Sequence, residues 1–327
     1  MIAHRFSVAE TLKHAVLIVG ALIVALPFYV MLSTSLKSPG EIERNEGGFF
    51  GAQAVMTDEY CVKRNEPERA AIEAARRAQP GLDETAVRTA LLATVRENCA
   101  TRPAIFNYVS AFSEAPLLLY LLNGIIVTAS IFLLQVIVAL PAAYALAKLK
   151  FWGRDLVFGL VLFCLLIPVH AIALPLYIAL AKLGLTNSYA ALVIPWTISV
   201  FGIFLMRQFF MTVPDDLIDA ARMDGMGEFS IVWKVMLPTA IPALLAFAIF
   251  SVVSHWNDYF WPRVVVTGDR SLFTPPLGLH EFRGGGGDGS LYGPMMASAT
   301  VIVAPLVVAF LLAQRRFIEG ITLSGMK

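Results

Sequence analysis

The sequence predicts an all-α integral membrane protein with six transmembrane helices. Of its 327 residues, 57% are hydrophobic and only 15% are charged, whereas soluble domains carry about 25% charged residues. Six segments lack Asp, Glu, Lys and Arg, and each exceeds the roughly 20 residues that a helix needs to cross a bilayer. They occupy residues 14–36, 115–147, 156–181, 183–206, 235–257 and 289–314. Their length and their lack of strict alternation exclude transmembrane β-strands of about 10 residues.

The first segment, residues 14–36, follows a short N-terminal stretch, residues 1–13. Its position is also that of a secretory signal, but its apolar core ends at Val30 and is followed by Ser33 and Thr34 rather than by a small-x-small cleavage site. We therefore expect a retained first transmembrane helix.

The Lys and Arg residues of the short segments fall unevenly on the two sides of the predicted helices. Eleven lie on the side of the N-terminus, namely Arg5, Lys13, Lys148, Lys150, Arg154, Arg207, Arg222, Lys234, Arg315, Arg316 and Lys327. Four lie on the other side, namely Lys182, Arg263, Arg270 and Arg283. Because short positive loops stay inside, we expect both termini to be cytoplasmic, with residues 315–327 as a C-terminal tail. Long translocated segments such as residues 37–114 are exempt from this rule.

The predicted periplasmic loop, residues 37–114, is soluble in composition. A helix is expected after Pro67 and a second after Asp83 as N-cap, so the sequence predicts a small helical hairpin inserted in this loop. Cys61 and Cys99 bracket it and form either a disulfide, which an oxidising exterior would allow, or two free thiols. Cys164, in the third apolar segment, is expected to be a small packing residue.

The sequence carries no recognisable catalytic constellation. The Gly-rich run at residues 284–287 follows Arg283, and neither the Gly-Lys-Ser/Thr end of a phosphate loop nor a His-Glu-x-x-His metal pair occurs. We expect no enzyme activity, no metal and no cofactor in this chain. If ATP drives the protein, a partner chain must bind ATP and Mg.

The most informative segment is the predicted cytoplasmic loop, residues 207–242. After Pro214 a short helix is expected over residues 215–223, with an acidic first turn that suits its dipole, and a second over residues 228–236. Gly225 and Gly227 allow the turn between them, and Pro238 ends the second helix. Either the loop docks a partner protein, or it is an ordinary loop with two amphipathic helices.

The spacing within this loop resembles the EAA motif of ABC importer permeases. Asp219-Ala220-Ala221 is followed after three residues by Gly225, and nine residues later by Val235, with Leu237-Pro238 two positions further on. The sequence departs from the motif at Asp219, where Glu is usual, and at Val235, where Ile is usual. The shorter Asp219 puts the reach of that carboxylate in doubt.

The resemblance covers residues 117–327 and is closest to the carbohydrate-type permeases, similar to the second membrane subunit of the maltose transporter. Besides the EAA-like loop it rests on residues 167–192, on Trp256-Asn-Asp-Tyr-Phe-Trp-Pro262, and on Gln314-Arg-Arg-Phe317 with Gly320. The hairpin between about residues 57 and 103 has no counterpart in the short members of that family.

The resemblance implies a type I ABC importer permease fold over residues 115–314, in a bacterial inner membrane. Its implied partners are a second permease subunit in a heterodimer, two ATPase subunits, and a periplasmic or lipid-anchored solute-binding protein. Closure of the ATPases would push on the loop and switch the bundle between inward and outward opening. The coupling residues it implies are Asp219, Ala220, Ala221, Asp224, Gly225, Leu237 and Pro238, and the tail from Arg315 is also expected to touch the ATPases.

Polar side chains within the predicted spans are costly in hydrocarbon, so they face the bundle interior or a pathway. They are Asn123, Thr128, Ser130, Gln135, His170, Thr197, Ser199, Ser251, Ser254, His255, Asn257, Ser298 and Thr300. Hydroxyl recognition and aromatic stacking suit sugars, and the candidate pathway residues are Asn123, His170, His255, Trp256 and Asn257. The alternatives are interhelical hydrogen bonds and, for the tryptophans, an interfacial belt.

The expected solute is a sugar, an oligosaccharide or a polyol, and glycerol phosphate or another glycerol derivative is the alternative within the same importer class. A secondary transporter is the remote alternative, because it requires intramembrane carboxylates. None occurs in the six segments, and Asp258 lies only at an end. Pro168, Pro175, Pro195 and Pro305 are expected either to kink the helices or to be tolerated bends.

Overall fold

A computed structural model describes residues 8–38, 41–42, 56–57, 62, 65–67, 69–78, 83–101, 103–283 and 292–324. The chain divides into two compact units. The first comprises Met1–Pro116 and Leu279–Val301, and the second comprises Leu117–Gly278 and Ile302–Lys327. Each unit is described by itself.

In the first unit, α1 (Val8–Ser35) is the first predicted membrane helix and α6 (Pro103–Glu114) packs against its end. The side-chain amide of Asn107 on α6 donates to the carbonyl oxygens of Ser35 and Lys37, both at 2.8 Å. These carbonyls follow the last turn of α1 and lack helical donors, so Asn107 completes the C-terminal end of that helix.

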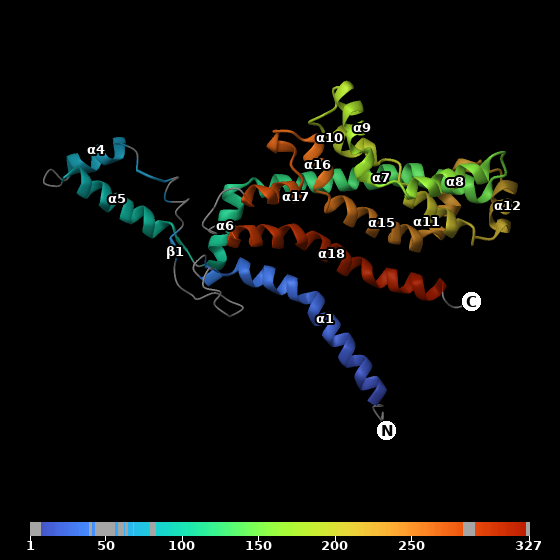
Figure 1. The fold of residues 1–327 in the computed structure, drawn as a ribbon, viewed down its shortest axis with the longest axis horizontal. Coiled ribbons are helices and arrows are strands. Elements are labelled where there is room, and N and C mark those ends of the chain that lie inside the picture. Colours follow the sequence, from blue (N-terminus) through green and yellow to red (C-terminus); the bar gives the residue numbers. More distant parts are fainter. Residues whose placement is uncertain are drawn as a thin grey trace. The chain divides into compact units, whose positions relative to one another are not determined.

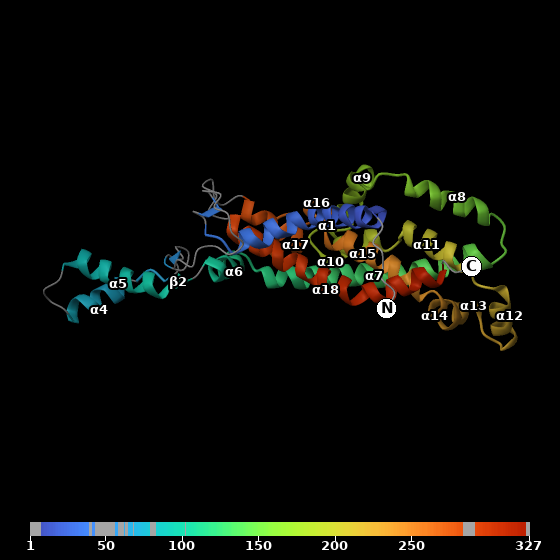
Figure 2. The same cartoon turned by 90° about the horizontal axis from the view of Figure 1, so that it is seen from below.

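The predicted insert consists of α4 (Arg69–Ala78) and α5 (Glu84–Asn98), which lie side by side (Figures 1 and 2). Ile72 and Val87 are the buried residues of the two helices, and Asp83 caps α5 as predicted. Two-residue strands, β1 (Met56–Thr57) and β2 (Ala100–Thr101), pair antiparallel on either side of the insert in sequence. Pro80 and Gly81, between the two helices in sequence, lie outside the described residues.

The cysteines differ in state. Cys99 is buried at the end of α5 and is disulfide-bonded. Cys61 lies outside the described residues, so its pairing with Cys99 stays a prediction. Cys164 is a free, exposed thiol on α8. The expectation that it packs in a core was wrong, because α8 buries none of its residues. The Gly-rich run at residues 284–287 also lies outside the described part.

The second unit is organised around α7 (Leu117–Lys148), a 32-residue helix. Both α11 (Val200–Phe210) and α15 (Ile241–Trp256) lie along it and against each other (Figures 1 and 2). A Cβ on Gly202 of α11 would overlap the ring of Phe247 on α15, so only glycine lets these helices approach this closely. Phe247, Ile203, Ala139 and Leu146 form the core between them.

Shorter elements of the second unit follow in chain order. They are α8 (Arg154–Leu165), α9 (Val169–Lys182), α10 (Tyr189–Val193), η1 (Ile194–Trp196), α12 (Asp215–Met223), α13 (Glu228–Ile231), η2 (Val232–Met236), α14 (Leu237–Thr239), α16 (Phe260–Val265), η3 (Arg270–Leu272) and α17 (Pro275–Leu279). After η4 (His280–Arg283), α18 (Tyr292–Ser324) contributes its first residues to the first unit and the rest to the second.

In the described part of the chain, four helical segments are long and apolar enough to cross a membrane. They are Leu12–Ser35, Leu117–Lys148, Tyr189–Phe210 and Tyr292–Leu312. Two further spans exist only if each of two bent pairs counts as one, α8 with α9 at 99° and Glu228–Thr239 with α15 at 86°. The predicted number of six transmembrane helices is reached only if each bent pair forms one span.

The breaks have local causes. Pro168 has an extended backbone, with φ −62° and ψ 127°, and its ring removes a helical hydrogen bond. The third predicted span therefore ends as a 12-residue α8, about 18 Å long, well short of the roughly 30 Å hydrocarbon core. In the fifth span, Ala240 leaves the helical region at φ −94° and ψ 8°, and α15 begins behind it with Pro242 in its first turn.

Candidate functional site

The loop between α11 and α15 holds α12 at a fixed place because both of its ends are specified by sequence. Pro214 is extended and precedes the first turn. At the other end, the Gly225 N–H donates to the Arg222 carbonyl and the Met226 N–H to the Ala221 carbonyl, both at 3.0 Å. Gly225 has φ +79°, which is the left-handed conformation required for this helix ending.

The inner face of α12 is part of the protein core. Ile218 and Ala221 are buried together with Ile231, Val232 and Met236 of the following helical turns. Their partners are on the ends of the two spanning helices, namely Leu140, Ala143 and Tyr144 of α7 and Met206 and Phe210 of α11. A displacement of α12 would therefore expose apolar surface unless α7 and α11 moved with it.

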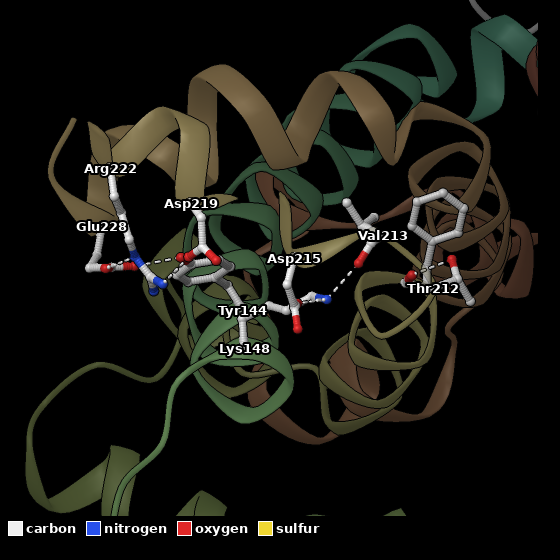
Figure 3. A network of polar contacts seen from close by, with 9 residues as sticks. Tyr144, Lys148, Thr212, Val213, Asp215, Asp219, Arg222 and Glu228 are labelled. Carbon is white, nitrogen blue, oxygen red and sulfur yellow. Dashed lines mark hydrogen bonds and ion pairs between the residues drawn. The ribbon is translucent and has the colours of Figure 1, made fainter. Parts of the chain in front are cut away.

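Polar contacts reinforce this packing from α7 (Figure 3). The Lys148 ammonium donates to the carbonyl oxygen of Val213 and to Oδ1 of Asp215, both at 2.6 Å. The Tyr144 hydroxyl donates to Oε2 of Glu228 at 2.5 Å. Lys148 is nearly buried, with its side chain 8% exposed, so its two contacts hold the start of α12 on the end of α7.

Arg222 connects α12 to α13 (Figure 3). Its Nε donates to Oε1 of Glu228 at 2.8 Å and its Nη1 to Oδ1 of Asp219 at 3.1 Å. The Glu228 carboxylate thus accepts hydrogen bonds from Arg222 and from Tyr144. The bond from Arg222, and after it the bond from Tyr144, hold the pKa of the Glu228 carboxyl below its ordinary value. The hydrogen bond from Lys148 likewise lowers the pKa of Asp215. Both carboxylates are ionised at neutral pH.

The residues predicted from the EAA-like spacing divide between two faces. Asp219, Ala220, Asp224 and Pro238 are exposed, and Gly225 forms the turn. Leu237 packs partly buried against the core below. Ala221 was expected on the same docking face as Ala220, but it is 4% exposed and belongs to the chain's own core. The reason is helical geometry, since consecutive residues are about 100° apart around the axis.

Four side chains of this network were missed by the sequence analysis as site residues, namely Tyr144, Lys148, Arg222 and Glu228. Tyr144 and Lys148 each lie more than 60 positions before the loop residues to which they bond. Their spacing of four on one helix face was the only available signal, and it did not name a partner. Arg222 and Glu228 lie inside the loop but outside the spacing of the motif.

The outer face of the loop carries large exposed apolar side chains. Met223 is 89% exposed, Phe229 67% and Leu217 47%. Ala220 is exposed between Leu217 and Met223 in the sequence of α12, and its small side chain would let a partner approach the helix closely. Large exposed apolar side chains that occur close together typically mark a protein contact, and the exposed residues Leu217, Ala220, Met223 and Phe229 are together called the docking face below.

The candidate pathway residues do not gather at one place. Asn123 is fully buried, and its amide binds the carbonyls of Ser271 and Phe273 and the Tyr189 hydroxyl. The Trp256 indole donates to the Ile302 carbonyl. The Asn257 side chain bonds back to Val253, and the ring of the exposed His170 lies against that of Phe260, with centroids 4.4 Å apart and the ring planes tilted by 53°.

Of these five residues, His255 lines a cavity between spanning helices, and the other four are not part of its lining. The cavity has a volume of about 250 Å³ and lies where α7, α11 and α15 meet. Its lining residues are Gln135, Ser199, Phe201, Phe247, Phe250, Ser251, Ser254 and His255. Among the described residues, no group of three His, Cys, Asp or Glu side chains could hold a metal ion.

Comparison with known families decides what kind of protein this is. Residues 135–322 match the model of the binding-protein-dependent transport system inner membrane component. The chain belongs to this family. It is thus a pore-forming permease component of an inner membrane ABC importer and not itself an enzyme.

Relatives of this permease are named transport components. It is 36% identical, over 68% of its chain and 78% of the relative, to the arabinooligosaccharides transport system permease protein AraQ of Halalkalibacterium halodurans. It is 34% identical, over 64% of its chain and 74% of the relative, to the sn-glycerol-3-phosphate transport system permease protein UgpE of Yersinia pestis.

A solved structure supports the fold of the permease. It is similar to a chain in the crystal structure of a bacterial ABC transporter involved in the import of the acidic polysaccharide alginate, with a TM-score of 0.69 and 20% identity. The likeness covers 95% of this chain and 99% of the other. The type I importer permease fold predicted from sequence is thereby confirmed.

Proposed function

We propose that this permease is the membrane subunit of an ATP-driven importer for a sugar, an oligosaccharide or a polyol, and that the loop at residues 207–242 couples it to the ATPases. The observation that carries the coupling role is the two-faced α12. Its inner face packs against α7 and α11, Lys148 of α7 donates a hydrogen bond to its first residue, Asp215, and its outer side carries the docking face.

The mechanism follows from this arrangement. The docking face contacts an ATPase subunit, with Asp219 and Asp224 at its polar edge. When the ATPases close on ATP and Mg, α12 is displaced. Because Lys148 and the buried core tie α12 to the ends of α7 and α11, these helices move with it and change access to the pathway. ATP and Mg bind to the partner ATPase, and no cofactor is needed in this chain.

The assembly we propose is a heterodimer with a second permease subunit, two ATPase subunits and a solute-binding protein that is periplasmic or lipid-anchored. The excess of Lys and Arg around residues 148–154, 207–234 and 315–316 supports a cytoplasmic position for both termini, the docking face and the C-terminal tail. The insert is then periplasmic. An alkaline phosphatase reporter that is active when fused to the C-terminus would contradict this orientation.

The solute class rests on relatives of the carbohydrate type, of which the arabinooligosaccharide permease is one. Glycerol phosphate is a second candidate because the relatives from Yersinia carry that name at similar identity. The two candidates differ in charge, so the polar lining of the pathway can distinguish them.

The coupling role is tested with Ala220→Trp. The substitution adds bulk at an exposed position of the docking face and touches no core residue. We expect recovery of the ATPase subunit with the tagged permease in mild detergent to fall roughly tenfold, which corresponds to about 1.4 kcal/mol of binding. The measurement is quantitative mass spectrometry of the co-purified proteins.

Ala74→Trp is the matched control, because Ala74 is exposed on α4 of the insert, outside the family match. It should leave ATPase recovery unchanged. Full recovery and full substrate-stimulated ATPase activity with Ala220→Trp would refute the docking role. A chain that never recovers an ATPase, yet transports in liposomes without ATP, would refute the importer function and favour a secondary transporter.

A further inference from the structure

The cavity at the meeting point of α7, α11 and α15 is built around a connected set of polar side chains. The Ser251 hydroxyl donates to Oε1 of Gln135 at 2.6 Å, and Nε2 of Gln135 donates to the Trp196 carbonyl at 2.8 Å. Nε2 of Gln135 is also 3.2 Å from Nε2 of His255. Gln135 and Ser251 are buried, so these contacts fix the inner wall of the cavity.

The open side of the cavity still offers hydrogen-bonding capacity. Ser254 is exposed, and its hydroxyl has no hydrogen-bond partner among the described residues. The half-buried His255 sits one position further along α15. Polar groups within spanning helices are costly unless they face protein or a water-filled pathway. Ser254 therefore marks the side on which the pathway runs.

Aromatic rings form the rest of the wall. Phe201 and Phe250 meet edge to face with centroids 5.3 Å apart, and Phe247 lies behind them. Aromatic faces next to hydroxyl and amide groups can pack against the carbon skeleton of a solute while its hydroxyls are hydrogen-bonded. The cavity of about 250 Å³ is smaller than the roughly 300 Å³ at which drug-sized pockets begin, so it suits one small unit at a time.

The charge of the lining separates the candidate solutes. None of its eight residues is Asp, Glu, Lys or Arg. A phosphate or carboxylate entering this site would lose water without gaining a cationic partner, which is strongly unfavourable in a low-dielectric site. A neutral hydroxylated solute loses only hydrogen bonds to water, and Ser254 and His255 can replace some of them.

We propose that this cavity is a transit site for an uncharged polyhydroxylated solute, with Ser254 and His255 as its contact residues, and that the importer excludes anionic solutes such as glycerol phosphate. This inference rests on the proposed importer function and extends it to a site and a substrate charge.

The test uses the reconstituted complex with its ATPase and its binding protein. The panel of solutes is an arabinose trisaccharide, a glucose trisaccharide, sorbitol, sn-glycerol-3-phosphate and a uronate trisaccharide. The solute that stimulates ATP hydrolysis is used in the labelling experiment. Ser254→Cys is made in a Cys164→Ser background, because Cys164 is a free, exposed thiol. A small, hydrophilic methanethiosulfonate reagent then measures access to position 254.

We expect a neutral member of the panel to stimulate ATP hydrolysis, and the thiol introduced by Ser254→Cys to react with the reagent. The same solute should slow this reaction at least about threefold, because it occupies the site. Val253→Cys is the matched control, because Val253 is exposed on the neighbouring apolar face of α15 and does not line the cavity. It should react slowly and independently of solute. Ser254→Ala should also raise KM for the neutral solute several-fold, whereas Ser298→Ala, a buried serine bonded to its own helix, should not.

Stimulation by an anionic member alone would overturn the inference while leaving the importer function intact. So would an unreactive Cys at position 254, or a reaction rate that the transported solute does not change, because the cavity is then covered or lies off the pathway. A complex that imports no panel member in the presence of ATP would instead contradict the proposed function.

Discussion

At the scale of single residues, the turn after α12 depends on one of its two glycines. Gly225 and Gly227 both lie in the turn after α12. Only Gly225 has a positive φ, of +79°, whereas Gly227 has φ −74° and ψ 155°. Neither would meet another atom if it carried a Cβ, so backbone conformation alone separates them.

This difference gives a matched pair of variants. Gly225→Val forces a β-branched residue into the left-handed region, at a cost of about 1–2 kcal/mol or more. We expect the end of α12 to lose its position and substrate-stimulated ATP hydrolysis to fall roughly tenfold in the reconstituted complex. Gly227→Ala should behave as the wild type. Equal activities of the two variants would contradict the role given to the turn.

At the scale of elements, α12 and α13 are held together by the Arg222–Glu228 pair and are held to α7 by Tyr144 and Lys148. The lowered pKa of Glu228 makes this contact pH-dependent. A carboxyl whose pKa is lower in the folded protein than in the unfolded chain stabilises the fold above the unfolded value. That stabilisation is lost as the pH falls through the folded pKa.

The pH profile of thermal unfolding of the purified permease tests this coupling. For the wild type, the midpoint should stay level from neutral pH down to the ordinary Glu pKa of about 4.3 and fall only below it. Arg222→Gln removes the main cause of the lowered pKa, so the part of the acid-induced fall that Glu228 contributes should shrink. Arg154→Gln removes the exposed partner of Asp155 on α8 and should not move the profile. Identical profiles for all three would disprove the coupling.

At the scale of the whole molecule, the insert is separable from the transport machinery. The family match begins at residue 135, and the insert forms its own small buried contact through Ile72 and Val87. β1 and β2 place Thr57 opposite Ala100, so the two ends of the insert are neighbours. Thr57 and Ala100 can therefore be joined by a short turn that replaces the insert.

Replacement of residues 58–99 by Asn-Gly should give a two-residue hairpin turn between β1 and β2. We expect the shortened permease to enter the membrane and to recover its ATPase subunit as the full chain does, because the docking face lies on α12 and α13. The measurement is ATPase recovery in detergent with the full chain as reference. Loss of recovery would indicate that the insert supports the fold of the permease.

Much of the site was predictable because the relevant signals are local. Pro214 and Gly225 specify the ends of α12, and the EAA-like spacing from Asp219 to Pro238 identified the loop without any structure. The side chains that fasten it were not predictable in the same way. Tyr144 and Lys148 come from the end of α7, and only the approach of α7 to the loop gives them Glu228 and Asp215 as partners.

The sequence by itself determined that this protein is an α-helical membrane permease, because uncharged segments of bilayer length and a fixed motif depend only on the order of residues. The tertiary structure decided which predicted spans bend, at Pro168 and Ala240, and that Ala221 packs inward while Ala220 remains exposed. It also gathered Gln135, Ser199, Ser251, Ser254 and His255 around one cavity, while Asn123 and Trp256 bond elsewhere. The physical reason is that a polar side chain in a membrane helix needs a partner, and only the packing of helices distant in sequence decides which partner it meets.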